Sequence, residues 1–163
     1  MTSLKKIALG LVVATTLATA AIATPASAAV ATALTVGGSS ATGGTTVSAP
    51  VALPVPADNS VDAADALKIG LTGLDTGTVV SAVATNGKIV TALSTVGAPV
   101  TASAGATSVS VNTGTGTTAD LYVFTTTTAV GTVAVTVGGN TTTYYFQGTA
   151  GALNAIELAG ATT

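Results

Sequence analysis

Short runs in which apolar residues alternate with polar or small ones fill the chain beyond residue 50. The run LKIGLT at 67–72 is typical, because Leu67, Ile69 and Leu71 occupy every second position. A period of two predicts a β-strand with one buried face. Glycine, asparagine and proline separate the runs at spacings of about 8 to 15 residues, and no helical period follows residue 28. The sequence therefore predicts an all-β fold, an antiparallel sandwich of about 7 to 9 strands.

The composition supports a folded, strand-rich domain. Charged residues make up only 6% of the chain and apolar residues 48%. Disordered chains combine low hydrophobicity with high net charge, which is the opposite balance. The abundant valine and threonine favour strands, because branched side chains pack well on a pleated surface. The absence of an internal repeat disfavours a solenoid.

The first 28 residues have the pattern of an export signal. The pair Lys5-Lys6 forms a positive start, an uncharged run extends over 7–23, and Ala26-Ser27-Ala28 is a small-residue cleavage site. We therefore expect a helical signal peptide at 1–28 and a mature chain that is secreted or held at the cell surface. A transmembrane anchor is the competing interpretation, but no positive stop-transfer charges follow the run.

The rest of the chain divides into a leader and one domain. Residues 29–50 contain two short apolar runs interrupted by glycine pairs, which indicates a flexible leader or a loosely attached first strand. Residues 51–163 are expected to form a single β-sandwich domain. The prolines of VALPVPA predict an edge strand or an extended linker at its start. The apolar run ALNAIELAG at 152–160 fits a terminal strand slightly better than a short helix.

A hairpin is predicted at Asn86-Gly87, which lies between two apolar runs. A two-residue loop there pairs Val83 with Val90, and Ala84 then lies opposite Ile89. Both faces of such a hairpin are apolar, so we expect it to be covered on both sides or to lie at a contact.

A second hairpin is predicted in the run TVAVTVGGNTTTYYFQGT, which holds three of the five aromatic residues. A two-residue loop at Gly139-Asn140 pairs Val135 with Tyr144 and Val133 with Phe146. Both aromatic side chains then fill the core. A three-residue loop would expose them instead and bury the intervening tyrosine.

The two-residue loop directs Tyr145 outward, beside Thr143 and Gln147. These three residues are the candidate surface contact. The nearby Asn140-Thr141-Thr142 matches the acceptor pattern for N-glycosylation, but a turn also favours asparagine at this place, and the turn is the interpretation that we favour. In ADLYVF at 119–124, the alternation leaves open whether Leu121 and Val123 or the two aromatic residues face the main core.

Two stretches resemble bacterial immunoglobulin-like surface domains. GTVAVTVGGNTTTYYFQGT is similar to their last hairpin, and PVPADNSVDAADALKIGLTG is placed like their opening strands. The resemblance covers roughly residues 50–150, and the chain departs from antibody-type domains because it lacks the paired cysteines and the core tryptophan. It implies an immunoglobulin-like sandwich with an exported structural or adhesive role, and it carries over no catalytic residue.

The available side chains exclude most familiar chemistry. Without histidine or cysteine, the usual nucleophilic triads and transition-metal sites cannot form. Lys68 and Lys88 follow no SxxK pattern, and nothing in the sequence brings Asp120 and Glu157 together as a glycosidase pair. We therefore expect no enzyme activity and no cofactor.

The charge balance excludes further partners. The mature chain has two lysines against six acids and no arginine, a formal net charge of −4. Nucleic acids and anionic lipid surfaces are bound mainly through lysine and arginine, so neither is an expected partner, and no membrane insertion of the mature chain is expected.

Calcium is a metal for which the sequence offers ligands. Asp58, Asp62 and Asp65 offer hard oxygen ligands within a short stretch. Their spacing does not match an EF-hand loop, and a solvated turn in which aspartate caps the main chain is the alternative that we favour.

Together these observations predict a secreted, non-catalytic structural module of the bacterial cell surface, such as a coat, a fibre or a segment of an envelope protein. With little charge to protect its sheet edges, we expect it to associate with itself or with other surface proteins, with residues 31–36 as one candidate strand for a neighbour's sheet. The alternative is an adhesin or carbohydrate-binding module that uses Tyr145 as an exposed aromatic platform for a glycan.

Overall fold

The computed structural model describes residues 30–56, 60–95 and 100–150. The expected signal peptide, Asp58 and the expected terminal strand lie outside these residues. Within the part of the chain that the structure describes, no helix is long and apolar enough to cross a membrane. The elements are β1 (Ala31–Val36), β2 (Ser39–Ser40), β3 (Val51–Pro54), β4 (Leu67–Thr72), β5 (Val79–Thr85), β6 (Lys88–Val90), the 3-10 turn η1 (Ala102–Ala104), β7 (Ser108–Asn112), β8 (Thr118–Phe124), β9 (Val130–Val137) and β10 (Asn140–Thr149).

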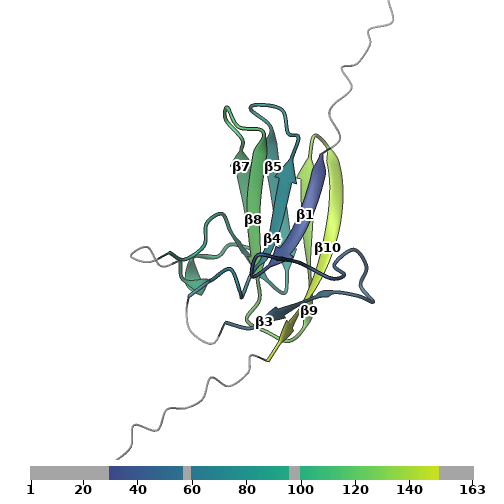
Figure 1. The fold of residues 1–163 in the computed structure, drawn as a ribbon, viewed down its shortest axis with the longest axis vertical. Helices are drawn as coiled ribbons and strands as arrows, with labels where there is room; N and C mark the ends of the chain where they lie inside the picture. Colours follow the sequence, from purple (N-terminus) through teal and green to yellow (C-terminus); the bar gives the residue numbers. More distant parts are fainter. Residues whose placement is uncertain (1–29, 57–59, 96–99, 151–163) are drawn as a thin grey trace, which may run out of the picture.

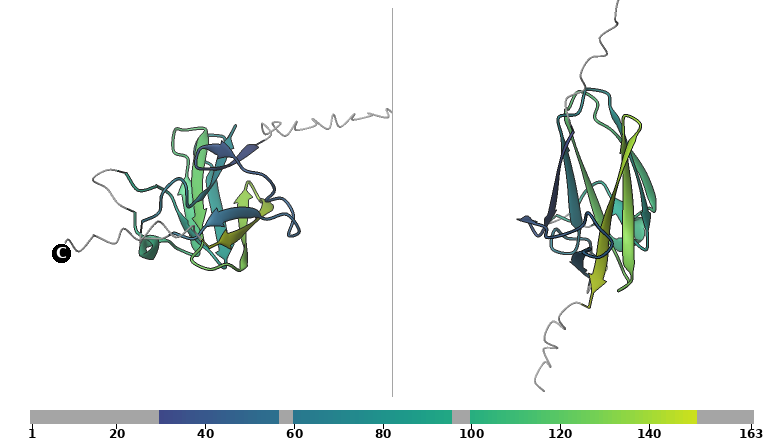
Figure 2. Two further views of the ribbon diagram at one scale, coloured as in Figure 1. Left: turned by 60° about the horizontal axis from the view of Figure 1, so that its bottom comes forward. Right: turned by 90° about the vertical axis from the view of Figure 1, so that its right-hand side faces the viewer.

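The strands form two five-stranded sheets that pack face to face (Figures 1 and 2). The β4 sheet has the order β2-β1-β4-β8-β6, and the β9 sheet has the order β3-β10-β9-β5-β7. Every pairing is antiparallel except that of β3 with β10, which is parallel. The predicted all-β sandwich is therefore confirmed. The described residues contain ten strands rather than 7 to 9, because short pieces such as β2 and β6 form strands of their own.

The core lies between the sheets and follows the predicted alternation. In β4, Leu67, Ile69 and Leu71 are buried, as expected. The sequence left open which residues of β8 face the main core. In the structure, Leu121 and Val123 point between the sheets. The aromatic residue Phe124 of β8 is buried in a smaller cluster. That cluster consists of Val61, Ala66, Val90 and Phe124.

The hairpin predicted at Asn86-Gly87 is wrong. Strand β5 ends in the β9 sheet, and β6 crosses to the other sheet, where Ile89 pairs with Val123. Strand β5 cannot accept β6, because β9 and β7 already occupy both of its edges. Asn86 still has the expected positive φ of 55°. Its Nδ2 donates to the carbonyl of Val130 at 2.9 Å, which fixes the corner between the sheets.

The hairpin of β9 and β10 forms, but its register differs from the prediction. The loop is Gly138-Gly139, with φ values of 56° and 82° that suit a type I′ turn. Tyr144 therefore pairs with Val133 rather than Val135, and Phe146 pairs with Gly131. The loop moves because two glycines accept positive φ more easily than a glycine followed by asparagine. A shift of two residues leaves the faces unchanged, so the predicted burial of Tyr144 and Phe146 is confirmed.

The N-terminal strands lie at the edges of the sandwich. Strand β1 pairs with β4 along its whole length, from Ala31 opposite Thr72 to Val36 opposite Leu67. Strand β3, which ends at Pro54, is the edge strand of the β9 sheet. Strands β1 and β10, which belong to different sheets, lie on the same side of the molecule (Figure 2).

Candidate functional site

The side of the sandwich between β1 and β10 is closed over only part of its length. Strand β3 pairs with β10 from Phe146 to Thr149. Just above it, the main-chain N–H of Tyr145 donates to the carbonyl of Gly44 at 2.9 Å. The loop that carries Gly44 also holds β1, because the N–H of Ala41 donates to the carbonyl of Leu34 at 2.9 Å. These contacts seal the half of the side that contains the end of β10.

Within the described residues, nothing pairs with the outer edge of β10 over its first half, and we call this stretch the vacant edge. Main-chain groups point to alternate sides along a strand. Because the N–H of Tyr145 points outward, the main-chain groups of Thr141 and Thr143 point outward as well. No main-chain hydrogen bond to another described residue engages them on that side. Thr141 and Thr143 are therefore two positions of β10 at which no other described residue pairs with the outward main-chain groups.

The facing edge of β1 also has no partner near its start among the residues that the structure describes. Strand β2 pairs only with Thr35 and Val36, and Ala41 bonds to Leu34. By the same alternation, the main-chain groups of Thr32 point to the free edge, with no described partner there. The two vacant edges lie on the same side of the sandwich, as the right-hand view of Figure 2 shows.

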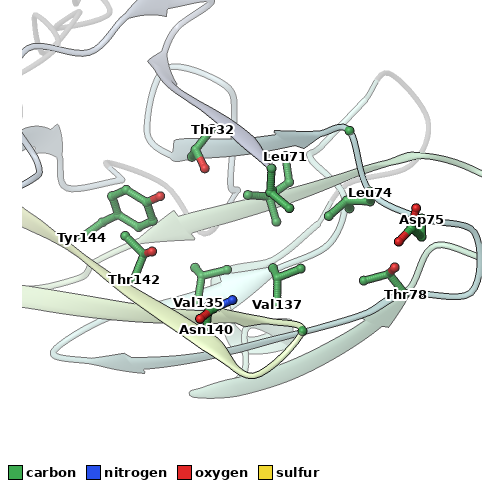
Figure 3. A pocket seen from close by; sticks show the side chains of 13 residues that line it. Thr32, Leu71, Leu74, Asp75, Thr78, Val135, Val137, Asn140, Thr142 and Tyr144 are labelled. Carbon is green, nitrogen blue, oxygen red and sulfur yellow. The ribbon is translucent and has the colours of Figure 1, made fainter. Parts of the chain in front are cut away.

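A cavity of about 440 Å³ lies between the sheets at this place (Figure 3). Its apolar wall comes from both sheets, with Leu71 and Leu74 on one side and Val135, Val137 and Tyr144 on the other. Apart from the exposed Val30, its remaining lining is small or polar. These residues are Val30, Thr32, Gly73, Asp75, Thr78, Gly138, Asn140 and Thr142.

The cavity exists because the inward positions at this end carry short side chains. On β10 the inward series changes from the ring of Tyr144 to the shorter side chains of Thr142 and Asn140 toward the turn, and on β1 the inward residue is Thr32. Larger apolar residues at these positions would close the space between the sheets. The sheets instead stay apart at an end where water reaches an apolar wall.

Charge is nearly absent around the cavity and from the whole β9 sheet. Asp75 is the only charged residue among those that line the cavity. None of the strands β3, β5, β7, β9 and β10 contains a charged residue. The ion pair between Lys68 Nζ and Asp120 Oδ2, 2.8 Å apart, belongs to the β4 sheet. The hydrogen bond that the Lys68 ammonium group donates to Asp120 raises the pKa of Lys68 above the ordinary value of 10.5.

The predicted contact residues lie on the outer face of the β9 sheet, away from the cavity. Thr143 and Gln147 are exposed and Tyr145 is half-buried. Gln147 Nε2 donates to the carbonyl of Thr128 at 3.4 Å. Their neighbours across the sheet carry hydroxyl or methyl groups, and the hydroxyls of Thr136 and Thr141 lie 2.7 Å apart. A row of Thr141, Thr136, Ser81 and Ser110 crosses the sheet.

This face also carries exposed valines. Val79 and Val83 on β5 are 49% and 53% exposed. The expectation that this segment is covered on both sides or lies at a contact rested on the Asn86-Gly87 hairpin, which does not form. In β5, the two outer valines are not covered by other described residues.

Two of the three proposed calcium ligands, Asp62 and Asp65, lie within the residues that the structure describes. Asp62 and Asp65 lie in the turn before β4, where the N–H of Asp65 donates to the carbonyl of Asp62 at 3.1 Å. Asp58 lies outside the described residues. Within 30–56, 60–95 and 100–150, no group of three histidine, cysteine or acidic residues is placed to hold a metal ion.

Comparisons with protein-family models, curated proteins and solved structures found no match to this chain. The site must therefore be interpreted from its own residues. Sequence reasoning missed the cavity and the vacant edge beside it. One signal for them was present in the sequence, since the inward positions of β10 change from aromatic residues to threonine and asparagine toward the turn.

Proposed function

We propose that the protein is a secreted, non-catalytic structural module of the bacterial cell surface, with an immunoglobulin-like sandwich that associates with other copies through its sheet edges. The observation that supports this most strongly is the vacant and uncharged edge of β10 at Thr141 and Thr143. The signal-like pattern of residues 1–28 supports export.

Edge strands normally carry features that prevent pairing with another chain. Charged side chains, proline and bulges are the usual ones. Strand β3 has Pro54, with Pro56 just after it, but the free part of β10 reads NTTTY and has neither charge nor proline. An added strand would gain main-chain hydrogen bonds there, and no charge repulsion would oppose it.

The cavity does not support a hydrolytic function. A glycosidase needs two carboxyl groups that flank the scissile bond at about 5 to 10 Å from each other. Among the residues that line the cavity, Asp75 alone carries a carboxylate. The cavity is therefore better suited to apolar groups than to catalysis.

Sedimentation and electron microscopy of the secreted chain at increasing concentration test the proposal. We expect oligomers that grow with concentration, that persist in high salt because few charges are involved, and that do not require calcium. A protein that remains strictly monomeric at high concentration would contradict the proposal. Assembly that depends on calcium would instead favour the metal site at Asp58, Asp62 and Asp65.

A carbohydrate-binding module is the second candidate, and the outer face of the β9 sheet favours it. The face is free of charge, offers rows of hydroxyls, and holds the half-buried ring of Tyr145. Aromatic faces and hydroxyls are groups that sugars contact. Glycan-array binding that is lost in Tyr145→Ala and retained in Tyr122→Ala, on the opposite sheet, would support this function. Equal binding by both variants would argue against it.

A further inference from the structure

The vacant edge and the cavity have the form of a site for one more strand. We propose that residues 153–158 of a second copy insert along Asn140–Tyr144 of β10, with Ile156 and Leu158 in the cavity between the sheets. This inference rests on the proposed function, because it names the segment through which copies associate.

The edge supplies the main-chain part of the site. The outward groups of Thr141 and Thr143 offer an N–H and a carbonyl each, at the spacing of a strand ladder. They continue the line along which β3 already pairs with Phe146 to Thr149. An inserted strand would therefore extend the same edge toward the β9–β10 turn.

The cavity supplies the side-chain part. Alternate residues of a strand on this edge point between the sheets, as Thr142 and Tyr144 do on β10 itself. They would meet the wall formed by Leu71, Leu74 and Val135. The space of about 440 Å³ falls within the range of about 300 to 1,000 Å³ that binding pockets span, and it accommodates aliphatic side chains.

The sequence LNAIEL at 153–158 has the alternation that this site needs. Ile156 and Leu158 share one face, and Glu157 lies on the other. With the two aliphatic residues in the cavity, Glu157 points to solvent. The opposite register would bury Glu157 beside Asp75, where desolvation and like charge both oppose it. The register is therefore determined by charge as well as by apolar contact.

The fold directs this segment toward another copy. The cavity lies at the end of the molecule where β1 and β10 begin, and β10 ends at the opposite end (Figure 1). A return along β10 in the same copy would meet β3, which occupies the edge from Phe146 to Thr149. Copies stacked end to end would instead bring 153–158 alongside the next β10, parallel to it as β3 is. Such a head-to-tail contact, repeated from copy to copy along one line, produces a fibre when the rotation between copies does not close a ring.

Substitutions in the full secreted chain test each half of the contact. Ile156→Asp places a charge in the cavity, and Thr143→Pro removes an outward N–H without breaking the ladder with β9. We expect each to raise the concentration for half-assembly at least about tenfold. The matched controls Glu157→Gln and Thr143→Val keep the contact and should assemble as the wild type does. Far-UV circular dichroism and the urea midpoint of each variant at low concentration show that the monomer is folded.

A disulfide locates the contact directly, since the chain has no cysteine of its own. The double variant Thr142→Cys with Ile156→Cys should form a ladder of covalent oligomers on oxidation, whereas Thr142→Cys with Glu157→Cys should form far fewer. A crosslink confined to monomers would overturn the inference, because it places the segment in its own copy.

The outcomes separate this inference from the proposed function. Oligomers that survive both Ile156→Asp and Thr143→Pro would leave edge association standing and overturn the inserted strand. A wild-type chain that never assembles would overturn both. If Thr143→Pro proves unfolded, the disulfide ladder and Ile156→Asp decide the question without it.

Discussion

The ring of Phe146 packs directly on the main chain at Gly131, its partner across β9 and β10. A Cβ atom at position 131 would lie closer than 3.0 Å to Cε2 and Cζ of that ring, a separation that real Cβ atoms essentially never show. It would also lie 2.7 Å from the carbonyl oxygen of Thr85. Gly131→Ala therefore forces two groups to move at once.

The size of the effect follows from these distances. Ordinary contact begins at 3.4 Å, so the Thr85 carbonyl must move by about 0.7 Å in addition to the ring. Overpacking of a core costs about 1 to 3 kcal/mol. We expect Gly131→Ala to lie at the upper end, about 3 kcal/mol, because main chain cannot rotate away as a side chain does.

A double-mutant cycle with Phe146→Leu separates the two clashes. Leucine lacks Cε2 and Cζ, so Gly131→Ala should cost about 1 kcal/mol less in the Phe146→Leu background, while the clash with Thr85 remains. Urea unfolding followed by tyrosine fluorescence and circular dichroism, at low protein concentration, measures each free energy. Gly70→Ala is the matched control, because a Cβ there meets nothing closer than 3.4 Å.

Two results would refute the reasoning. One is a cost for Gly131→Ala no larger than that for Gly70→Ala. The other is strict additivity between Gly131→Ala and Phe146→Leu, which would mean that the ring does not press on this position.

Three further predictions use the same urea assay. Thr125→Val should cost about 1 to 3 kcal/mol, because the buried Thr125 Oγ1 donates to the carbonyl of Asn86 at 2.9 Å; the exposed Thr126→Val is its control, and equal costs would contradict the prediction. Asn86→Ala should cost about 1 to 2 kcal/mol and Asn86→Gly less, since glycine loses the bond to Val130 but relieves the positive φ; the reverse order would contradict it. Asp120→Asn should cost less than about 1 kcal/mol at neutral pH, because both partners are about 40% exposed (40% and 43%). The pKa of Lys68 is raised in the folded state, so the contribution of the ion pair to stability is present below pH 10.5 and is lost as the pH rises through the raised pKa. A cost of Asp120→Asn that persists in high salt at pH 12 would argue against an ion pair.

The strands could be predicted because each needs only local alternation. The pattern of Leu67, Ile69 and Leu71 places one face inward whichever strands lie beside it. The pairing of strands cannot be predicted from local alternation, because it depends on which strand edges are already occupied. Asn86-Gly87 has the local chemistry of a hairpin turn, yet β7 and β9 take both edges of β5 and the chain crosses to the other sheet.

The faces of the last hairpin could be predicted although its register could not. Exchanging the loop Gly139-Asn140 for Gly138-Gly139 shifts the pairing by an even number of residues. An even shift leaves Tyr144 buried and Tyr145 outward. Register is decided by small differences between adjacent turn residues, whereas the faces follow from the period of the strand.

The vacant edge could not be predicted, because it depends on how far separate segments reach along β10. Strand β3 covers the edge up to Phe146, and Gly44 takes the next main-chain position. The sequence alone does not state where either contact ends. The cavity follows from the same cause, since only the three-dimensional arrangement shows that the short side chains of Thr32 and Thr142 face one another between the sheets.

Amide hydrogen exchange of Thr141 and Thr143, in dilute and in assembled protein, tests the central claim most directly. If this edge of β10 is the contact between copies, both amides exchange rapidly in the monomer and become protected on assembly, while the amides of Tyr144 and Phe146 are protected in both states. Assembly that leaves Thr141 and Thr143 exchanging as fast as in the monomer would contradict the claim.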